Sequence, residues 1–188
     1  FPYVKTAFEE AEDATHLKIR KLCLDGPEDE LKLTANTQPC ILTVSVAVWR
    51  ALVNEIGLKP DFFAGHSLGE YSAVVAAGRL ELAQASVLVR KRGEAMQAAV
   101  PVGVGAMAAV MGVAADDLEA RCKLASTGGK VVEVVNFNSP QQLVVAGHKI
   151  SVDALCNKLE TDGLRFVSLP VSAPFHSSLM KPAREYMT

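Results

Sequence analysis

The amino-acid sequence predicts an α/β fold in which a larger body is interrupted by a smaller inserted subdomain. In the larger body, a short apolar strand from Asp61 to Ala64 leads through a tight turn into a helix. From Gly103 onward, short apolar strands and helices follow in the order β-α-β-β-α-β, which over roughly 70 residues is the ferredoxin-like split unit. We therefore expect a small subdomain at residues 102–168 and a larger one at 1–101 and 169–188.

Helices are expected to occupy most of the larger body. The longest of them is capped by Asn36 or Thr37, has Pro39 in its first turn, and is ended by Gly57. Its interior is mostly apolar and should be largely buried. The expected helical ranges are 3–14, 15–25, Ile41 to Ile56, Glu70 to Ala77 and Leu82 to Ala99.

The small subdomain alternates strands with two helices. Asp116 and Asp117 begin the first of these helices, where the helix dipole favours acidic residues. The expected strands are Gly105 to Gly112, Val131 to Phe137, Gln142 to Gly147 and Arg165 to Val171, and the helices are Asp116 to Ser126 and Ser151 to Thr161.

Composition and charge exclude several classes of function. A net charge of −2 argues against a nucleic-acid partner or a polybasic membrane contact. No apolar run reaches the roughly 18 residues that a membrane span needs, so no membrane is expected. The cysteines are scattered, and none forms a C-x-x-C pair, which indicates reduced thiols in the cytoplasm rather than a metal or redox centre. They are Cys23, Cys40, Cys122 and Cys156.

The segment Gly65-His66-Ser67-Leu68-Gly69 has the G-x-S-x-G pattern of a catalytic serine turn. Serine at a sharp strand-to-helix turn has its hydroxyl thrust outward, and small neighbours relieve the crowding. The backbone N–H of Leu68 would face the oxyanion of a tetrahedral intermediate. Because the pattern lies between an apolar strand and a helix, we interpret Ser67 as a nucleophile for acyl transfer, rather than as a structural Gly-Ser turn.

A serine nucleophile needs a base, and the chain has four histidines. His16 is expected on a helix surface, His66 should leave the turn in another direction, and His148 should be a solvated loop residue. His176 follows Pro174 and Phe175 in a constrained loop, which makes it the best candidate base by location. The alternative is an ordinary loop histidine.

Arg92 falls on the apolar stripe of the helix from Leu82 to Ala99. The other residues of this stripe are Leu82, Ala85, Val89, Met96 and Ala99. A guanidinium on an inward stripe needs an anionic or well-bonded partner. The alternatives are an ion pair with a carboxylate of the protein, a side chain that extends out to water, or a contact with a carboxylate of a substrate. The spacing alone does not decide between the structural alternatives and the substrate contact. Gly93 beside it suggests a close approach of another segment at this turn.

These motifs together resemble the malonyl-CoA:acyl carrier protein transacylases of fatty-acid synthesis and the related acyltransferase domains of polyketide synthases. The matching segments cover nearly the whole chain in the order of the family. They are Thr37-Gln38-Pro39, Gly65 to Ala73, Arg92 to Met96, Gly105 to Val110, Asn136 to Gln141 and Pro170 to His176.

The resemblance implies a hydrolase-like large subdomain with a parallel sheet, and a malonyl group carried on Ser67 from coenzyme A to the thiol of acyl carrier protein. His176 would be the base and Arg92 would hold the malonyl carboxylate. The other residues that it places at the substrate are Leu68, Gln38, Met96, Asn136 and Asn138. It implies no metal and no cofactor beyond the coenzyme A thioester, which is a substrate, and it implies a cytoplasmic monomer.

The chain also departs from this family. It lacks the Gly-Gln-Gly-x-Gln loop near the start and stops soon after His176, so we expect an internal fragment of a longer enzyme. Two other functions stay open. A serine hydrolase would use the same turn without preferring acidic acyl groups, and a non-catalytic module would bind acyl carrier protein through a basic patch.

Overall fold

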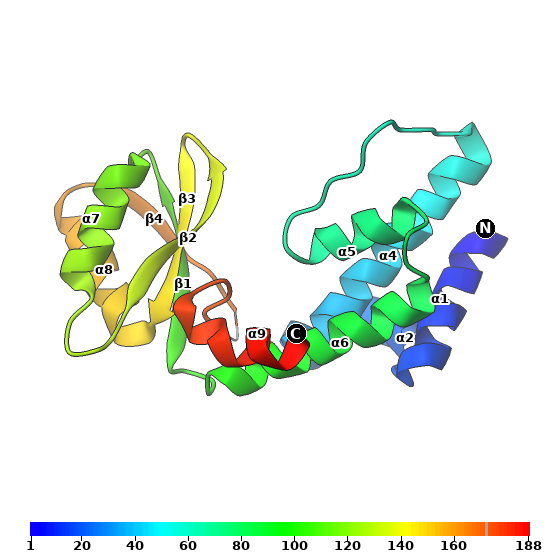
Figure 1. Ribbon diagram of the computed structural model, residues 1–188, viewed down its shortest axis with the longest axis horizontal. Helices are drawn as coiled ribbons and strands as arrows, with labels where there is room; N and C mark the ends of the chain where they lie inside the picture. The colour runs from blue at the N-terminus through cyan, green and yellow to red at the C-terminus, as the bar shows by residue number, and fades with distance from the viewer. Residues whose placement is uncertain (172) are drawn as a thin grey trace. The chain divides into compact units, whose positions relative to one another are not determined.

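The computed structural model describes residues 1–171 and 173–188, which divide into two compact units, Phe1–Glu94 and Ala95–Thr188 (Figure 1). In its described residues the first unit is helical and contains no strand. Its helices are α1 (Pro2–Thr15), α2 (Ile19–Asp25), α3 (Glu28–Lys32), α4 (Thr34–Ile56), α5 (Leu68–Ala76) and the greater part of α6 (Leu82–Ala99).

The core of the first unit lies among α1, α4, α5 and α6. Leu42 and Val46 of α4 are almost fully buried there, together with Ala7 of α1. The same cluster contains Leu82, Ala85 and Val89, the first half of the stripe predicted for α6. The 3.6-residue period therefore placed this stripe correctly.

Helix α4 begins earlier than the sequence indicates. The predicted caps Asn36 and Thr37 lie inside it, and Leu33 occupies the capping position without a side-chain bond. Pro39 is the sixth helical residue rather than a first-turn residue. Proline there removes one backbone hydrogen bond of the helix, and Pro39 is buried. Its predicted end is correct, since Gly57 adopts the left-handed conformation that closes it.

The strand predicted from Asp61 to Ala64 is absent. The segment is an irregular link, and Phe62 is 91% exposed while Phe63 is 37% exposed. A strand requires a neighbour for its backbone groups, and within the described residues no other segment pairs with this one. An apolar run indicates a propensity, and only pairing makes it a strand.

Helix α4 is also longer than expected, and it is not largely buried as the sequence predicts. It has 23 residues and contains a window with a mean hydropathy of 1.3, of which 33% is buried. The expectation that no segment is long and apolar enough to cross a membrane is therefore wrong by length and composition. This is weak support for a span, because the core helix of a water-soluble protein passes the same test.

The second unit contains a four-stranded antiparallel sheet in the order β2-β3-β1-β4. The elements run in the order β-α-β-β-α-β, as the sequence indicates. They are β1 (Gly105–Met111), α7 (Ala115–Ala125), β2 (Val132–Ser139), β3 (Gln142–His148), α8 (Lys149–Thr161) and β4 (Arg165–Ser168).

Both faces of this sheet carry apolar side chains. Figure 1 shows α7 and α8 together on one face, where Ala108 and Val110 of β1 pack with Leu118 and Leu155 of the helices. The alternate residue Met107 belongs to a second cluster, which includes Leu169 and Phe175. Since successive strand residues point to opposite faces, two covered faces explain why β1 reads as a continuous apolar run.

The chain after β4 differs from the expectation. The strand ends at Ser168 rather than at Val171, because β1 pairs with only four residues of β4. A short 3₁₀ helix, η1 (Ser178–Met180), and α9 (Lys181–Met187) then follow. Ala173 and Met180 pack there with Met96 and Val100 in a separate apolar cluster. This packing holds the segment around His176 within the second unit.

All four cysteines are free thiols. Burial raises the pKa of Cys122 to about 12 and that of Cys156 to about 11, from an ordinary value of 9.0. Raised thiol pKa values stabilise the folded state fully below pH 9.0. This contribution to the free energy of unfolding is lost as the pH rises from 9.0 towards the pKa values of the folded state, because over that range the thiols ionise mainly in the unfolded state.

We therefore expect the free energy of unfolding to fall more steeply above pH 9.0 in the wild type than in Cys122→Ala. Urea unfolding of both proteins between pH 8 and pH 10.5 measures this difference, and the comparison removes the titration that lysines and tyrosines contribute to both. Equal slopes would contradict the burial of the Cys122 thiol.

Candidate active site

Ser67 lies at a sharp turn immediately before α5. Its φ is 52° and its ψ is −104°, in a region that residues with a side chain rarely occupy. The turn is closed by the Gly69 amide, which donates to the His66 carbonyl at 2.8 Å. Leu68 is the first residue of α5, so its N–H has no acceptor within the helix. A strained serine beside such an N–H suits a nucleophile with an oxyanion donor next to it.

Gly65 is required by the close approach of the turn to itself. A Cβ at Gly65 would lie 1.9 Å from the carbonyl carbon and oxygen of Gly69. A Cβ at Gly69, the second glycine of the motif, would have no neighbouring atom within 4 Å. Within the described residues, steric crowding therefore requires a glycine at Gly65 but not at Gly69.

We expect Gly65→Ala to lower the free energy of unfolding by about 1–3 kcal/mol, since the turn must open to admit a methyl group. The matched variant Gly69→Ala should be neutral or stabilising by up to about 1 kcal/mol, because alanine is the better helix former. Urea unfolding of both variants measures the difference. Equal effects of the two substitutions would show that the turn is not packed in this way.

Arg92 points from α6 at the serine. Its Nη2 donates to Ser67 Oγ at 3.1 Å, and its Nη1 donates to Gln38 Oε1 at 2.5 Å. Gln38 is 5% exposed, and its Nε2 donates to Thr34 Oγ1 at 2.9 Å. Thr34 and Gln38 stand four residues apart on α4, so both face α6. These hydrogen bonds from Thr34 through Gln38 to Arg92 hold the guanidinium in an orientation that points towards Ser67.

The guanidinium also has an aromatic contact. Its central carbon lies 5.7 Å from the ring centroid of Tyr71, one turn beyond Ser67 on α5. Over residues 1–171 and 173–188, none of the ion pairs includes Arg92. Among these described residues, a carboxylate of the protein, one of the partners that the sequence leaves open, therefore does not pair with this arginine.

Gly93 explains how α6 comes so near to α4. A Cβ at Gly93 would lie 2.6 Å from the Ala35 Cα and from the Thr34 carbonyl oxygen. The close approach that the sequence suggests beside Arg92 is thus the start of α4. It brings Gln38 within reach of Arg92, because the two backbones touch.

His176 lies in the second unit, shortly before η1. It is exposed and has a φ of 64°, the left-handed conformation. Ser177 follows it and donates through Oγ to the Pro174 carbonyl at 2.7 Å. Pro174 packs on β1, where a Cβ at Gly105 would lie 2.3 Å from the proline Cδ. The loop is therefore constrained, as the sequence predicts.

The other three histidines lie at a helix end, at a strand end and at the serine turn. His16 ends α1 in the left-handed conformation. His148 is not a solvated loop residue as expected, because its Nδ1 accepts the Val131 amide at 3.0 Å. His66 is exposed beside Ser67. These positions do not test the prediction that His176 is the base, which stays a prediction.

Met96, Asn136 and Asn138 were predicted near the substrate by the resemblance. Met96 is 7% exposed within the apolar cluster of the second unit. Asn136 is half-buried on β2, and the side-chain amide of Asn138 donates to Gln142 Oε1 at 3.0 Å across the β2–β3 turn. Met96 and Asn138 have clear packing and hairpin roles here.

Two residues of the arginine site are not among those predicted from the sequence. Thr34 orients Gln38, and Tyr71 lies beside the guanidinium. A signal was available for each, since Thr34 lies four residues from Gln38 and Tyr71 lies four residues from Ser67. Residues at this spacing share a helix face.

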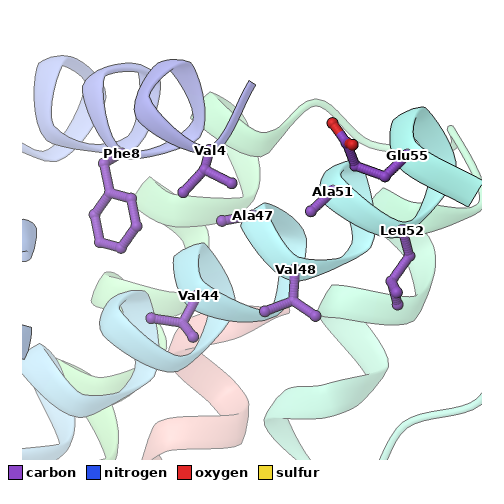
Figure 2. A pocket seen from close by; sticks show the side chains of 8 residues that line it. All are labelled: Val4, Phe8, Val44, Ala47, Val48, Ala51, Leu52 and Glu55. Atoms are coloured by element: carbon purple, nitrogen blue, oxygen red, sulfur yellow. The ribbon is translucent and has the colours of Figure 1, made fainter. Parts of the chain in front are cut away.

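The first unit also contains an apolar groove of about 300 Å³ between α1 and α4 (Figure 2). Val4 and Phe8 of α1 face Val44 and Val48 of α4 across it, and Glu55 is its one charged lining residue. None of the predicted site residues lines this groove. The candidate catalytic and substrate-binding side chains of the first unit, Ser67 and Arg92, lie together elsewhere.

The chain is similar to known proteins over nearly its whole length. Residues 4–188 match a family model described as an acyl transferase domain. The chain is 48% identical over 185 residues to a malonyl CoA-acyl carrier protein transacylase of Bacillus subtilis and 46% identical over 186 residues to one of Escherichia coli. Each alignment covers 98% of this chain, but it covers 46% and 60% of those relatives. The chain thus spans about half the length of the curated relatives it matches.

Solved structures give the same result. The transacylase of Coxiella burnetii is 42% identical and superposes with a TM-score of 0.95, over 100% of this chain and 59% of that one. A malonyl-transacylase in complex with a type II polyketide synthase acyl-carrier protein is 44% identical, with a TM-score of 0.94, over 100% of this chain and 60% of that one. The fold described above is therefore found in transacylases of known structure.

Proposed function

Since the chain belongs to the acyl transferase domain family, we propose that its protein transfers a malonyl group from coenzyme A to the phosphopantetheine thiol of acyl carrier protein. The reaction would pass through a malonyl ester of Ser67 and would serve fatty-acid biosynthesis. Malonyl-CoA and acyl carrier protein are then the partners, as the names of the relatives suggest.

One observation carries this proposal, the contact of 3.1 Å between the Arg92 guanidinium and Ser67 Oγ. In a malonyl ester, one methylene separates the ester carbonyl from the free carboxylate. An acyl group attached to Ser67 thus begins beside the guanidinium and brings its carboxylate within reach. Arginine offers two parallel N–H donors to a carboxylate, and acetyl has no group to receive them.

The proposed mechanism has two similar halves. His176 takes the Ser67 hydroxyl proton while Oγ attacks the thioester carbonyl carbon, and the Leu68 N–H donates to the oxyanion. The carbon–sulfur bond then breaks, and His176 returns the proton to the departing coenzyme A sulfur. In the second half, the carrier thiol loses its proton to His176 and attacks the ester carbon, and Ser67 leaves with that proton. The role of His176 rests on the family resemblance and on its constrained loop.

We propose the finer architecture on the same basis. The second unit would contribute a ferredoxin-like small subdomain at 102–168, and residues 1–101 and 169–188 would belong to a hydrolase-like large subdomain with a parallel sheet. Val44, Val48 and Leu52 of α4 expose apolar side chains, which supports the proposal that a further part of the large subdomain packs on this face of α4. We also propose a cytoplasmic monomer that uses no metal and no cofactor besides its thioester substrate.

The test is the intact mass of the full-length protein after brief incubation with malonyl-CoA, acetyl-CoA or no thioester. We expect a malonyl adduct that disappears when acyl carrier protein is added, and little adduct from acetyl-CoA. Release of free acid from both thioesters at equal rates would instead indicate a serine hydrolase. Tight carrier binding without any adduct would indicate a non-catalytic module.

A further inference from the structure

The backbone at His176 is held in a conformation that a histidine does not adopt by preference. A left-handed residue other than glycine is disfavoured by about 1–2 kcal/mol. Its φ is 64°, and its side chain is exposed, so burial of the imidazole does not hold it there. Such a conformation persists only where neighbouring contacts fix the chain on both sides.

The contacts before His176 are supplied by the loop and by β1. Ala173 is 1% exposed, the Phe175 amide donates to the Ala173 carbonyl at 3.0 Å, and Pro174 packs on Gly105. These contacts fix the entry of the loop. They do not reach beyond Ser177, whose hydroxyl bonds back to Pro174.

The exit of the loop is fixed by a carboxylate from another element. The Ser178 amide, two residues after His176, donates to Glu133 Oε2 at 2.7 Å. Glu133 belongs to β2 and stands opposite Ala146 of β3 in the sheet register, so its backbone is held by the sheet. A hydrogen bond to an ionised acceptor is roughly twice as strong as one between neutral groups.

We propose that Glu133 is a positioning residue for His176. By accepting the Ser178 amide, its carboxylate fixes the exit of the loop and keeps the imidazole in the orientation that its role as the base requires. This role rests on the proposed function, because it gives His176 the part of the base. Glu133 touches neither substrate nor nucleophile in this scheme and acts only through the loop.

The experiment compares Glu133→Ala and Glu133→Gln with the wild type in the full-length protein. Glu133→Ala should lower the rate of malonyl-serine formation in single turnovers about tenfold, because a small displacement of a catalytic group costs this much or more. The KM for malonyl-CoA should change by less than about twofold, since no substrate contact is lost. Glu133→Gln should recover most of the rate, because its side-chain oxygen still accepts the amide.

Hydrogen exchange of the Ser178 amide, followed by mass spectrometry or NMR, tests the contact itself. It should be about tenfold faster in Glu133→Ala, which corresponds to about 1.4 kcal/mol in the local opening. Glu119→Ala is the matched control, an exposed glutamate of the same unit on α7, and should change neither exchange nor rate.

Three results would overturn the proposal, and they are distinguishable. Unchanged Ser178 exchange in Glu133→Ala would remove the contact. Faster exchange with an unchanged rate of ester formation would leave Glu133 a structural residue only. A wild-type protein that forms no malonyl ester would refute the proposed function, and the role of Glu133 in it, whatever the amide shows.

Discussion

Ser67→Ala is expected to abolish the malonyl adduct and to lower malonyl transfer by about three orders of magnitude or more. Alanine removes the oxygen that would carry the acyl group, while the Arg92 guanidinium and the Leu68 N–H stay in place. Thioester binding should therefore survive. Intact mass after incubation with malonyl-CoA and a steady-state assay with acyl carrier protein measure the two effects.

Ser72→Ala is the matched control for this substitution. Ser72 lies on α5, which begins directly after Ser67, and its buried hydroxyl has no hydrogen-bond partner among the described residues. Its removal should leave both the adduct and the transfer rate unchanged. A malonyl adduct of normal yield in Ser67→Ala would mean that another residue is the nucleophile.

Arg92→Ala is expected to lower kcat/KM for malonyl-CoA about 100-fold, since a charge-assisted contact to the substrate carboxylate is lost. The value for acetyl-CoA should change by less than about threefold, because acetyl offers no carboxylate. The measured quantity is the ratio of the two kcat/KM values. Arg92→Lys should recover only part of the ratio, since an ammonium cannot form the paired bonds of a guanidinium.

Lys91→Ala provides the control for removal of a positive charge from the same turn. Lys91 is exposed, and its loss should leave the ratio unchanged. The assignment of Arg92 would be wrong if Arg92→Ala lowered malonyl and acetyl transfer by the same factor. Such a uniform loss would indicate that the guanidinium supports the turn at Ser67 and does not select the acyl group.

The arginine site illustrates how far sequence reasoning reaches. The period of α6 placed Arg92 on the buried stripe with Ala85 and Val89, and Gly93 indicated a close neighbour. The partner could not be found in this way, because Gln38 lies 54 positions away on α4. Which helix lies against which is decided by packing, and a period within one helix contains no information about it.

The strand expected from Asp61 to Ala64 and the cap expected at Asn36 or Thr37 are the opposite cases. Both rested on local preferences. A strand needs a second strand, and a helix start can be moved by tertiary packing, as the beginning of α4 at Thr34 shows. Local preference is weak compared with such contacts, so element ends are predicted less well than element types.

The sequence by itself determined the order of elements from β1 to β4, the buried stripe of α6 and the serine in its turn. These depend on periods of two and 3.6 residues and on small residues at fixed spacing, which are properties of neighbouring positions. The tertiary structure alone decided that Arg92 meets Ser67 and that Glu133 holds the amide of Ser178. Those contacts join residues 25 and 45 positions apart, and only the folded chain brings such residues together.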